Sequence, residues 1–343
     1  MFLKCDRHNY KNHSYFNFLN NNFSFLFAIF LVLLTLSGCQ TNSNSNNDRT
    51  DSDNTNTEVV ENKDNSSGET SPQVFKLGIL SIDSAVSVKE RYTPLIKYLQ
   101  ETTGYQFELV SLTQETQFSQ VENKTIDFAT TNPLSSVQIQ RLYDTEFLVT
   151  HSRPNTKTQF SGLIVVNANS DIQTVEDLKG KNGACVNFQT AAGGCTFQIY
   201  HLLEKGINPQ TDSASFVENK SQDNIVLGVL NGSLDFGFIR TGQLEKMQRK
   251  GLIEDTNELR ILEPIADDFF YTHTTALYPE WPIANLTHVD PKIVEEVKTA
   301  LLAIPDDHPA LKAIGIEEFV APVDYSSLEN LIETLKLKTW DAE

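Results

Sequence analysis

The amino-acid sequence predicts an α/β protein with two lobes, each a mostly parallel sheet flanked by helices. Short apolar runs typical of strands alternate with amphipathic segments along most of the chain, and this alternation is the pattern of parallel sheets. The patterned part, residues 74–340, is long for one compact core and suits two.

The first block of the pattern alternates three strands with three helices. Within 91–101, Leu95, Ile96 and Leu99 fall on one face of a helix. The other expected elements are strands 74–80, 107–112 and 126–130 and helices 117–123 and 133–143, the last opened by Pro133.

A second block repeats this alternation. Its expected strands are 160–166, 183–187, 213–217 and 234–239, and its expected helices are 174–179, 195–205, 224–231 and 241–249. Two amphipathic helices, 291–304 and 326–335, follow, and we expect them to pack back on the first lobe. The expected divisions are lobe 1 in 74–160, lobe 2 in 161–264 and a return to lobe 1 in 265–343.

The N-terminal residues predict export. A basic leader precedes an apolar run, Phe25–Leu34, which is short for a membrane span of about 20 residues. Small residues and a cysteine follow it directly, so residues 1–39 have the pattern of a secretory signal peptide. Leu-Ser-Gly-Cys resembles the bacterial lipobox, in which the cysteine, here Cys39, is lipidated and becomes the mature N-terminus. The alternative is an uncleaved N-terminal anchor with a fortuitous cysteine.

Residues 40–73 predict a flexible tether. The segment is crowded with Asn, Ser, Thr and Asp, and its only aliphatic residues are Val59 and Val60. It therefore cannot bury enough apolar surface to offset the entropy lost on ordering. We expect it to hold the folded part away from a membrane.

The charge of the chain excludes some classes of partner. The formal net charge is -18, and because the leader carries more basic than acidic residues, the exported chain is more acidic still. Nucleic acid and anionic lipid surfaces are therefore not expected partners. A small anion binds such a chain only where local donors overcome the unfavourable long-range field.

Two cysteines, Cys185 and Cys195, remain beyond the leader and the lipidation site. In an oxidising compartment they form either a disulfide or two free thiols beside a pocket. Two cysteines without a nearby histidine pair do not predict metal ligation, and the seven histidines have no metal-ligand spacing. The sequence thus predicts neither a metal site nor a cofactor.

Five short segments follow one another along the chain: Thr93–Leu99, Ile126–Pro133, Val175–Lys181, Gly206–Pro209 and Gly232–Gly237. Together they resemble the phosphonate/phosphite-type periplasmic binding proteins of ABC transporters. Segments 239–245, 277–284 and 320–325 also resemble the branch fused to sensor histidine kinases, including tetrathionate-type sensors. The resemblance covers residues 74–337 and implies a type II binding-protein fold, with a ligand cleft between the lobes and a hinge of two crossing strands.

The resemblance also implies a function. We expect a non-enzymatic, monomeric lipoprotein, in the periplasm or at the cell surface, that captures a small oxyanion by lobe closure for an ABC permease. The oxyanion would be a phosphonate, phosphite, phosphate-like or sulfur oxyanion. One alternative is a free-standing sensor that signals to a histidine kinase. Another is a thiol-dependent enzyme that uses Cys195 on a sulfur compound.

Two helix starts are candidate anion sites, because a helix N-terminus offers unpaired N–H groups and a favourable dipole. The first provides Thr130, Thr131, Asn132, Ser135 and Ser136. The second is the Gly-rich turn 187–195, which provides Gln189, Thr190, Gly193, Gly194 and Cys195. The alternatives are an ordinary Asn N-cap before Pro133 and a tight turn without a ligand. The turn carries fewer hydroxyls than the family pattern, which weighs against a simple phosphonate or phosphate.

Arg240 is the strongest single candidate for binding the oxyanion. It ends a predicted buried strand, and its planar guanidinium can hold an oxyanion through two parallel hydrogen bonds. The resemblance implies that aminophosphonate binders of the family carry acidic groups in this region to hold the ligand's amine, so Arg240 with Thr241 favours an anion without an ammonium group. The alternative is that Arg240 pairs with a surface carboxylate. Weaker candidates are Ser84, Gln222 and an aromatic wall of Phe160 and 278–281, although aromatic side chains more often belong to the core.

Overall fold

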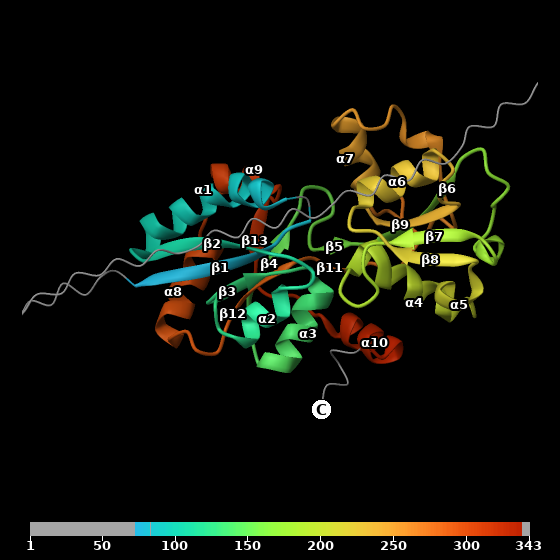
Figure 1. The fold of residues 1–343 in the computed structure, drawn as a ribbon. Coiled ribbons are helices and arrows are strands. Elements are labelled where there is room, and N and C mark those ends of the chain that lie inside the picture. The colour runs from blue at the N-terminus through green and yellow to red at the C-terminus, as the bar shows by residue number, and fades with distance from the viewer. Residues whose placement is uncertain (1–72, 83, 338–343) are drawn as a thin grey trace, which may run out of the picture. The chain divides into compact units, whose positions relative to one another are not determined.

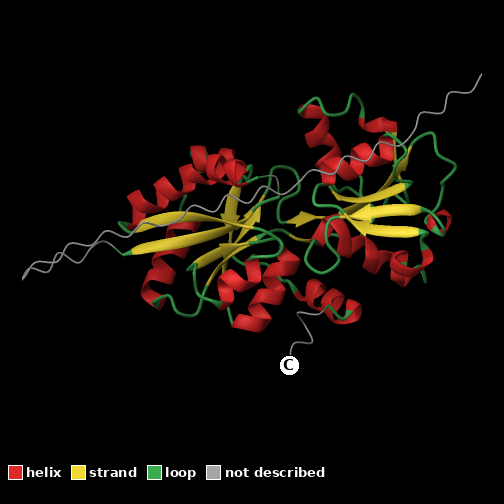
Figure 2. Ribbon diagram, in the orientation of Figure 1, coloured by secondary structure: helices red, strands yellow, loops and turns green. Residues whose placement is uncertain are grey.

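The computed structural model describes residues 73–82 and 84–337. The predicted signal peptide, the lipidation site Cys39 and the tether up to residue 72 lie outside the described residues. The described part belongs to one compact unit, and Figures 1 and 2 show it as two groups of strands covered by helices. The predicted two-lobed α/β class is confirmed.

The first lobe is built on a six-stranded sheet in the order β13-β4-β12-β3-β1-β2. Its strands are β1 (Val74–Leu80), β2 (Gln106–Leu112), β3 (Phe128–Thr130), β4 (Glu146–Ser152), β12 (Pro282–Asn285) and β13 (Glu318–Val320). Its helices are α1 (Ala85–Thr103), α2 (Gln117–Glu122), α3 (Pro133–Tyr143), α8 (Pro291–Leu302) and α9 (Pro309–Ile314). β1 is parallel to β2 and β3, whereas β12 is antiparallel to β3 and β4, and β13 is antiparallel to β4.

The second lobe is built on a five-stranded sheet in the order β10-β6-β9-β7-β8. Its strands are β6 (Gly162–Asn167), β7 (Asn182–Cys185), β8 (Ser215–Glu218), β9 (Phe236–Arg240) and β10 (Leu259–Ile261). Its α-helices are α4 (Phe197–Glu204), α5 (Pro209–Asp212), α6 (Gln222–Leu230) and α7 (Gln243–Arg249), joined by a π-helix, η2 (Ala192–Thr196), and the 3₁₀-helices η1 (Glu176–Leu178) and η3 (Thr256–Glu258).

Both sheets are mixed, although most strands in each run one way. β7 is parallel to β8 and β9, whereas β6 is antiparallel to β9 and β10. The antiparallel strands β6 and β12 are the first strands that the chain forms after entering the second lobe and after returning to the first. The segments that connect the lobes thus reverse the strand direction, which the βαβ pattern alone does not reveal.

The chain passes between the lobes twice, at 153–161 and at 274–281. These segments contribute β5 (Gln159–Phe160) and β11 (Tyr278–Pro279), which pair in an antiparallel two-stranded sheet. Buried hydroxyls bind the two passages together, since Ser161 Oγ donates to the Thr275 carbonyl at 2.7 Å. The resemblance implied a hinge of two crossing strands at this place.

The C-terminal helix α10 (Ser326–Leu335) packs against α3 of the first lobe and α4 of the second. Its buried face, Leu328, Leu331 and Ile332, belongs to a cluster that includes Leu134 of α3 and Phe197 of α4. The helix was expected to pack on the first lobe, and it contacts both. Figure 1 shows it in red beside α3.

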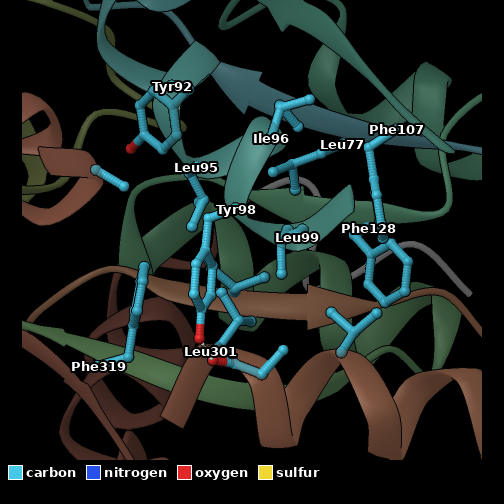
Figure 3. Packing of buried hydrophobic residues seen from close by; sticks show 14 of the residues in the cluster. Leu77, Tyr92, Leu95, Ile96, Tyr98, Leu99, Phe107, Phe128, Leu301 and Phe319 are labelled. Atoms are coloured by element: carbon cyan, nitrogen blue, oxygen red, sulfur yellow. Dashed lines mark hydrogen bonds between the residues drawn. The ribbon is translucent and has the colours of Figure 1, made fainter. Parts of the chain in front are cut away.

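The core of the first lobe fixes the orientation of α1. Tyr92, Leu95 and Leu99 of α1 are buried in one hydrophobic cluster with residues of the sheet and with Leu301 of α8 (Figure 3). Burying each large apolar side chain contributes about 1.5–3 kcal/mol, so this face cannot rotate away from the core. Arg91, next to the buried Tyr92, is therefore held at a defined place on the helix.

Several elements were not predicted. They are β4, β10 to β13, α5 and α9, most of them four residues or shorter and therefore without a clear period. The predicted helix 195–205 begins earlier, at Ala192, with the five-residue π-helix η2, which contains Gly193 and Gly194. Within the described ranges, no helix combines the length and apolar character needed to cross a bilayer.

Candidate ligand-binding site

A cavity of about 570 Å³ is lined by both lobes. The first lobe contributes the start of α1, the passages between the lobes and the loop after α9. The second contributes η2, the start of α6 and α7 along its length. Its volume is within the range of about 300–1,000 Å³ that is common for small-molecule sites. The predicted location of the site between the lobes agrees with this geometry.

The lining of the cavity is strongly basic. It contains seven basic side chains and two acidic ones, although the whole chain has a formal charge of -18. The basic residues are Arg91, Arg153, Lys220, Arg240, Lys246, Arg249 and Lys250, and the acidic ones are Asp223 and Glu280. The cavity therefore concentrates positive charge in a protein that otherwise repels anions.

Six of the predicted site residues line this cavity: Asn132, Gly193, Gly194, Gln222, Arg240 and Thr241. Of the predicted aromatic wall, Phe160 and Trp281 line it, whereas Tyr278 is buried with its ring stacked on Phe197 at 3.9 Å between centroids. Ser84 caps α1 and lines a smaller neighbouring cavity of about 30 Å³. The remaining candidates, Thr130, Thr131, Ser135, Ser136, Gln189, Thr190 and Cys195, do not line the large cavity.

The polar side chains at the start of α3 bind the second lobe and one another. Asn132 caps the helix by accepting from the Ser135 N–H, and its Nδ2 donates to the Thr190 carbonyl of the Gly-rich turn at 2.8 Å. Ser135 Oγ donates to the same carbonyl at 3.1 Å, and the hydroxyls of Thr131 and Ser136 lie 2.7 Å apart. This helix start thus offers only Asn132 to the cavity.

The Gly-rich turn is held by a disulfide between Cys185, at the end of β7, and Cys195, within η2. Their Cα atoms are 5.0 Å apart and both side chains are fully buried. The turn is further closed by the Val186 N–H, which donates to the Gly194 carbonyl at 3.0 Å. Cys195 therefore supports the turn from inside the lobe and presents no free thiol.

Gly193 is required by close packing at the cavity wall. A Cβ atom there would lie 2.9 Å from the Phe160 ring, 3.0 Å from the Ser161 carbonyl oxygen and 3.2 Å from the Arg240 Cβ. The absence of a side chain lets the backbone approach Arg240. The turn and the arginine thus form one continuous wall.

Arg240 is the last residue of β9, and its backbone is fixed by α6. Its N–H donates to Gln222 Oε1 at 2.9 Å, and its Nη1 donates to the Thr241 carbonyl at 3.0 Å. The Thr241 hydroxyl accepts from the Ser161 N–H at 3.1 Å and lies 3.2 Å from the Ser161 carbonyl. Gln222 and Thr241 thus position Arg240 while they line the cavity beside it.

The first lobe contributes two arginines that sequence reasoning missed. Arg91 Nη2 donates to the Ile314 carbonyl at 2.6 Å. Arg153 donates from Nε to Glu280 Oε1 at 2.7 Å and from Nη1 to the Gly315 carbonyl at 3.2 Å. Burial alone would lower the pKa of Arg153, but the buried Glu280 carboxylate beside it raises that pKa above its ordinary value. No local pattern marks these two residues.

Helix α7 and its C-cap residue contribute three further basic residues, Lys246, Arg249 and Lys250. The positions i, i+3 and i+4 lie on one face of a helix, so all three reach the cavity together. The sequence did indicate these basic residues, since a helix was predicted at 241–249, directly after Arg240.

Comparison with known proteins identifies the family. The model of the family described as "ABC transporter, phosphonate, periplasmic substrate-binding protein" matches residues 77–326. The tetrathionate sensor histidine kinase TtrS of Salmonella typhimurium is 25% identical over 267 residues, which is 76% of this chain and 44% of the kinase. The chain thus spans less than half of that kinase.

Solved structures share the fold at lower identity. The protein XAC2383 of Xanthomonas citri, solved with bound ATP, has a TM-score of 0.63 at 21% identity over 79% of this chain and 99% of its own. A methylphosphonate-bound protein of Prochlorococcus marinus has a TM-score of 0.63 at 16% identity, and the match covers 77% of this chain and 99% of that protein. With the match of the family model over most of its length, the chain belongs to the phosphonate-type periplasmic substrate-binding proteins of ABC transporters, an extracytoplasmic family of binding proteins.

Proposed function

We propose that this chain is a lipid-anchored binding protein that captures a small oxyanion between its lobes and delivers it to an ABC permease. The observation that carries the proposal is the set of seven basic side chains around one cavity in a chain of net charge -18. Oxyanions are the small molecules that such a lining binds best, because arginine donors match their geometry.

The expected contacts come from both lobes. Arg240 and the backbone at Gly193 and Gly194 would hold the anion from the second lobe, and Arg91 from the first. A micromolar dissociation constant needs about 8.2 kcal/mol, and hydrogen bonds to charged groups contribute about 1.5–3 kcal/mol each. A few such bonds suffice once closure excludes water and strengthens them.

Lobe closure would follow from contacts on both sides of the cavity. A ligand that touches both lobes binds the closed form better than the open one and so shifts the equilibrium between them. The paired passages β5 and β11 are the natural hinge, since they are the chain connections between the two sheets. Residues of the passages, including Arg153 and Phe160, line the same cavity.

The anchor and the partner complete the proposal. Lipidation at Cys39 and a tether over 40–73 would keep the closed form within reach of a permease in the membrane. The second candidate function is sensing, in which the closed form signals to a histidine kinase. The similarity to the sensor kinase TtrS supports it and adds sulfur oxyanions to the candidate ligands. The buried disulfide at Cys195 weighs against the thiol-enzyme alternative.

A thermal-shift screen tests the binding function. The panel is phosphate, phosphite, alkyl- and aminophosphonates, sulfate, thiosulfate, tetrathionate and small carboxylates. A ligand at a hundredfold excess over its dissociation constant stabilises the folded state by about 2.7 kcal/mol, which gives a clear shift. We expect one class of oxyanion to shift the unfolding temperature and Arg240→Ala to reduce that shift.

The matched control is Lys179→Ala, which removes an exposed basic residue of the same lobe that does not line the cavity. It should leave the shift intact, because distant surface charges are screened at physiological salt. An absence of any shift with folded protein would overturn the proposal. Deletion of the permease genes then separates transport from sensing, since only transport requires them.

A further inference from the structure

The basic residues of the cavity form two groups on opposite lobes. The five on the second lobe are Lys220, Arg240, Lys246, Arg249 and Lys250, accompanied by Asp223. The first lobe contributes Arg91 and Arg153, accompanied by Glu280. Each lobe therefore carries more basic than acidic side chains at the cavity, and a single small oxyanion seated at one group does not offset the excess of positive charge in the other.

The two arginines of the first lobe are held as a pair. Their guanidinium groups bind consecutive carbonyls, Ile314 and Gly315, at the end of α9. The second arginine is also paired with Glu280, whose side chain is only 4% exposed. The ends of α9 and β11 thus fix both guanidinium groups before any ligand arrives.

These contacts leave donors for a ligand. A guanidinium has five N–H groups. The hydrogen bonds described above use one of them in Arg91 and two in Arg153. Both residues line the cavity, so the remaining N–H groups belong to side chains that a ligand can reach. The pair has the donors and the rigidity needed to hold a second oxyanion group.

The size of the cavity also favours a ligand with a second acidic group. At about 570 Å³ it is in the middle of the range for drug-sized ligands, far larger than one phosphonate or sulfate group requires. A second acidic group on the same ligand would use both the space and the charge of the first lobe.

We infer that the ligand carries two oxyanion groups at separate ends, one held by Arg240 and the basic face of α7, the other by Arg91 and Arg153. This inference rests on the proposed oxyanion-binding function and specifies its ligand class. A ligand of this kind bridges the two lobes by its own length, so each end contributes to closure.

Isothermal titration of the purified full chain tests the inference with paired probes. Methylphosphonate is compared with alkane bisphosphonates of one to four methylene groups, and methanesulfonate with the corresponding disulfonates, at fixed ionic strength. We expect one spacer length in one of the two series to bind at least tenfold more tightly than its single-headed partner. This gain is the lower end of what one additional charged hydrogen bond provides, about 10- to 100-fold.

Variants then place the second group. Arg91→Gln should reduce the ratio of double-headed to single-headed affinity by about tenfold or more, because it removes donors from one end only. Lys97→Gln removes a charge from the same helix at a side chain that is 76% exposed and outside the cavity lining, and should not change the ratio. Thermal unfolding of each variant confirms that it is folded.

Each remaining outcome is decisive. If single-headed probes bind and no double-headed probe binds more tightly, the inference is overturned while the proposed function stands. The same holds if Arg91→Gln weakens both kinds of probe equally. If no probe of either kind binds, the proposed oxyanion function itself has failed.

Discussion

The ion pair between Arg153 and Glu280 is expected to stabilise the fold as well as the cavity. Arg153 follows β4 and Glu280 follows β11, so their 2.7 Å hydrogen bond joins the two passages that connect the lobes. Replacing Glu280 by Gln keeps the shape of the side chain and removes its charge. The arginine is then left beside a neutral group in a largely buried place.

The size of the loss follows from the burial of each partner. Breaking a fully buried pair costs about 3–5 kcal/mol. The Glu280 side chain is 4% exposed and that of Arg153 is 27% exposed, so water solvates the released charge in part. Arg153 also keeps its hydrogen bond to the Gly315 carbonyl. We therefore expect Glu280→Gln to lower the free energy of unfolding by about 2–3 kcal/mol.

Urea denaturation of the wild type, Glu280→Gln, Arg153→Gln and the double variant measures this loss. If the pair itself is responsible, the double variant is less destabilised than the sum of the single ones, because the second change removes the uncompensated charge. A loss below about 0.5 kcal/mol in Glu280→Gln would refute the reasoning, since it is the size expected for an exposed pair.

Two further predictions concern stability. Cys185→Ser with Cys195→Ser should lower the free energy of unfolding by about 2–3 kcal/mol, the value for a loop of about ten residues; an unchanged urea midpoint would contradict a disulfide that constrains the unfolded chain. Burial, aided by the nearby Arg153 and Arg91, lowers the pKa of His151 well below its usual value. As the pH falls, this histidine is therefore protonated in the unfolded chain before it is protonated in the folded one. The stability of the wild type should therefore fall more steeply than that of His151→Leu as the pH drops below about 6.5, by up to about 1.4 kcal/mol per pH unit. If urea denaturation shows that the free energy of unfolding falls equally in the wild type and in His151→Leu between pH 7 and pH 5, His151 does not contribute to the pH dependence of stability.

The sequence predicted the fold class and most of the longer elements, because their apolar periods are strong. The strand 74–80 and the helices 133–143 and 326–335 have the predicted limits. The sequence did not predict the short strands β10 to β13, because whether such segments are strands depends on the neighbours with which they pair. The strand β6 was predicted, but its antiparallel direction was not.

The residues that line the cavity were predictable where they are local in sequence. Arg240, Gln222 and the two glycines of the turn line the cavity, as expected from a strand end and a Gly-rich helix start. Arg91 and Arg153 were not predicted, because only the packing of α1 and α9 brings them together.

The hydroxyl groups at the start of α3 were predicted to bind the anion, and in the structure they make other contacts. Ser135 and its neighbours have the composition of an anion site, but their donors bind the Thr190 carbonyl and one another. A single sequence does not reveal that these two segments from different lobes meet.

The most direct test of the central claim is a crystal structure of the chain with the oxyanion that gives the largest thermal shift. We predict that the anion lies in the cavity between the lobes, with its oxygens in hydrogen-bonding distance of Arg240 and the backbone at Gly193 and Gly194. An anion bound elsewhere on the surface, with the cavity filled only by water, would contradict the claim.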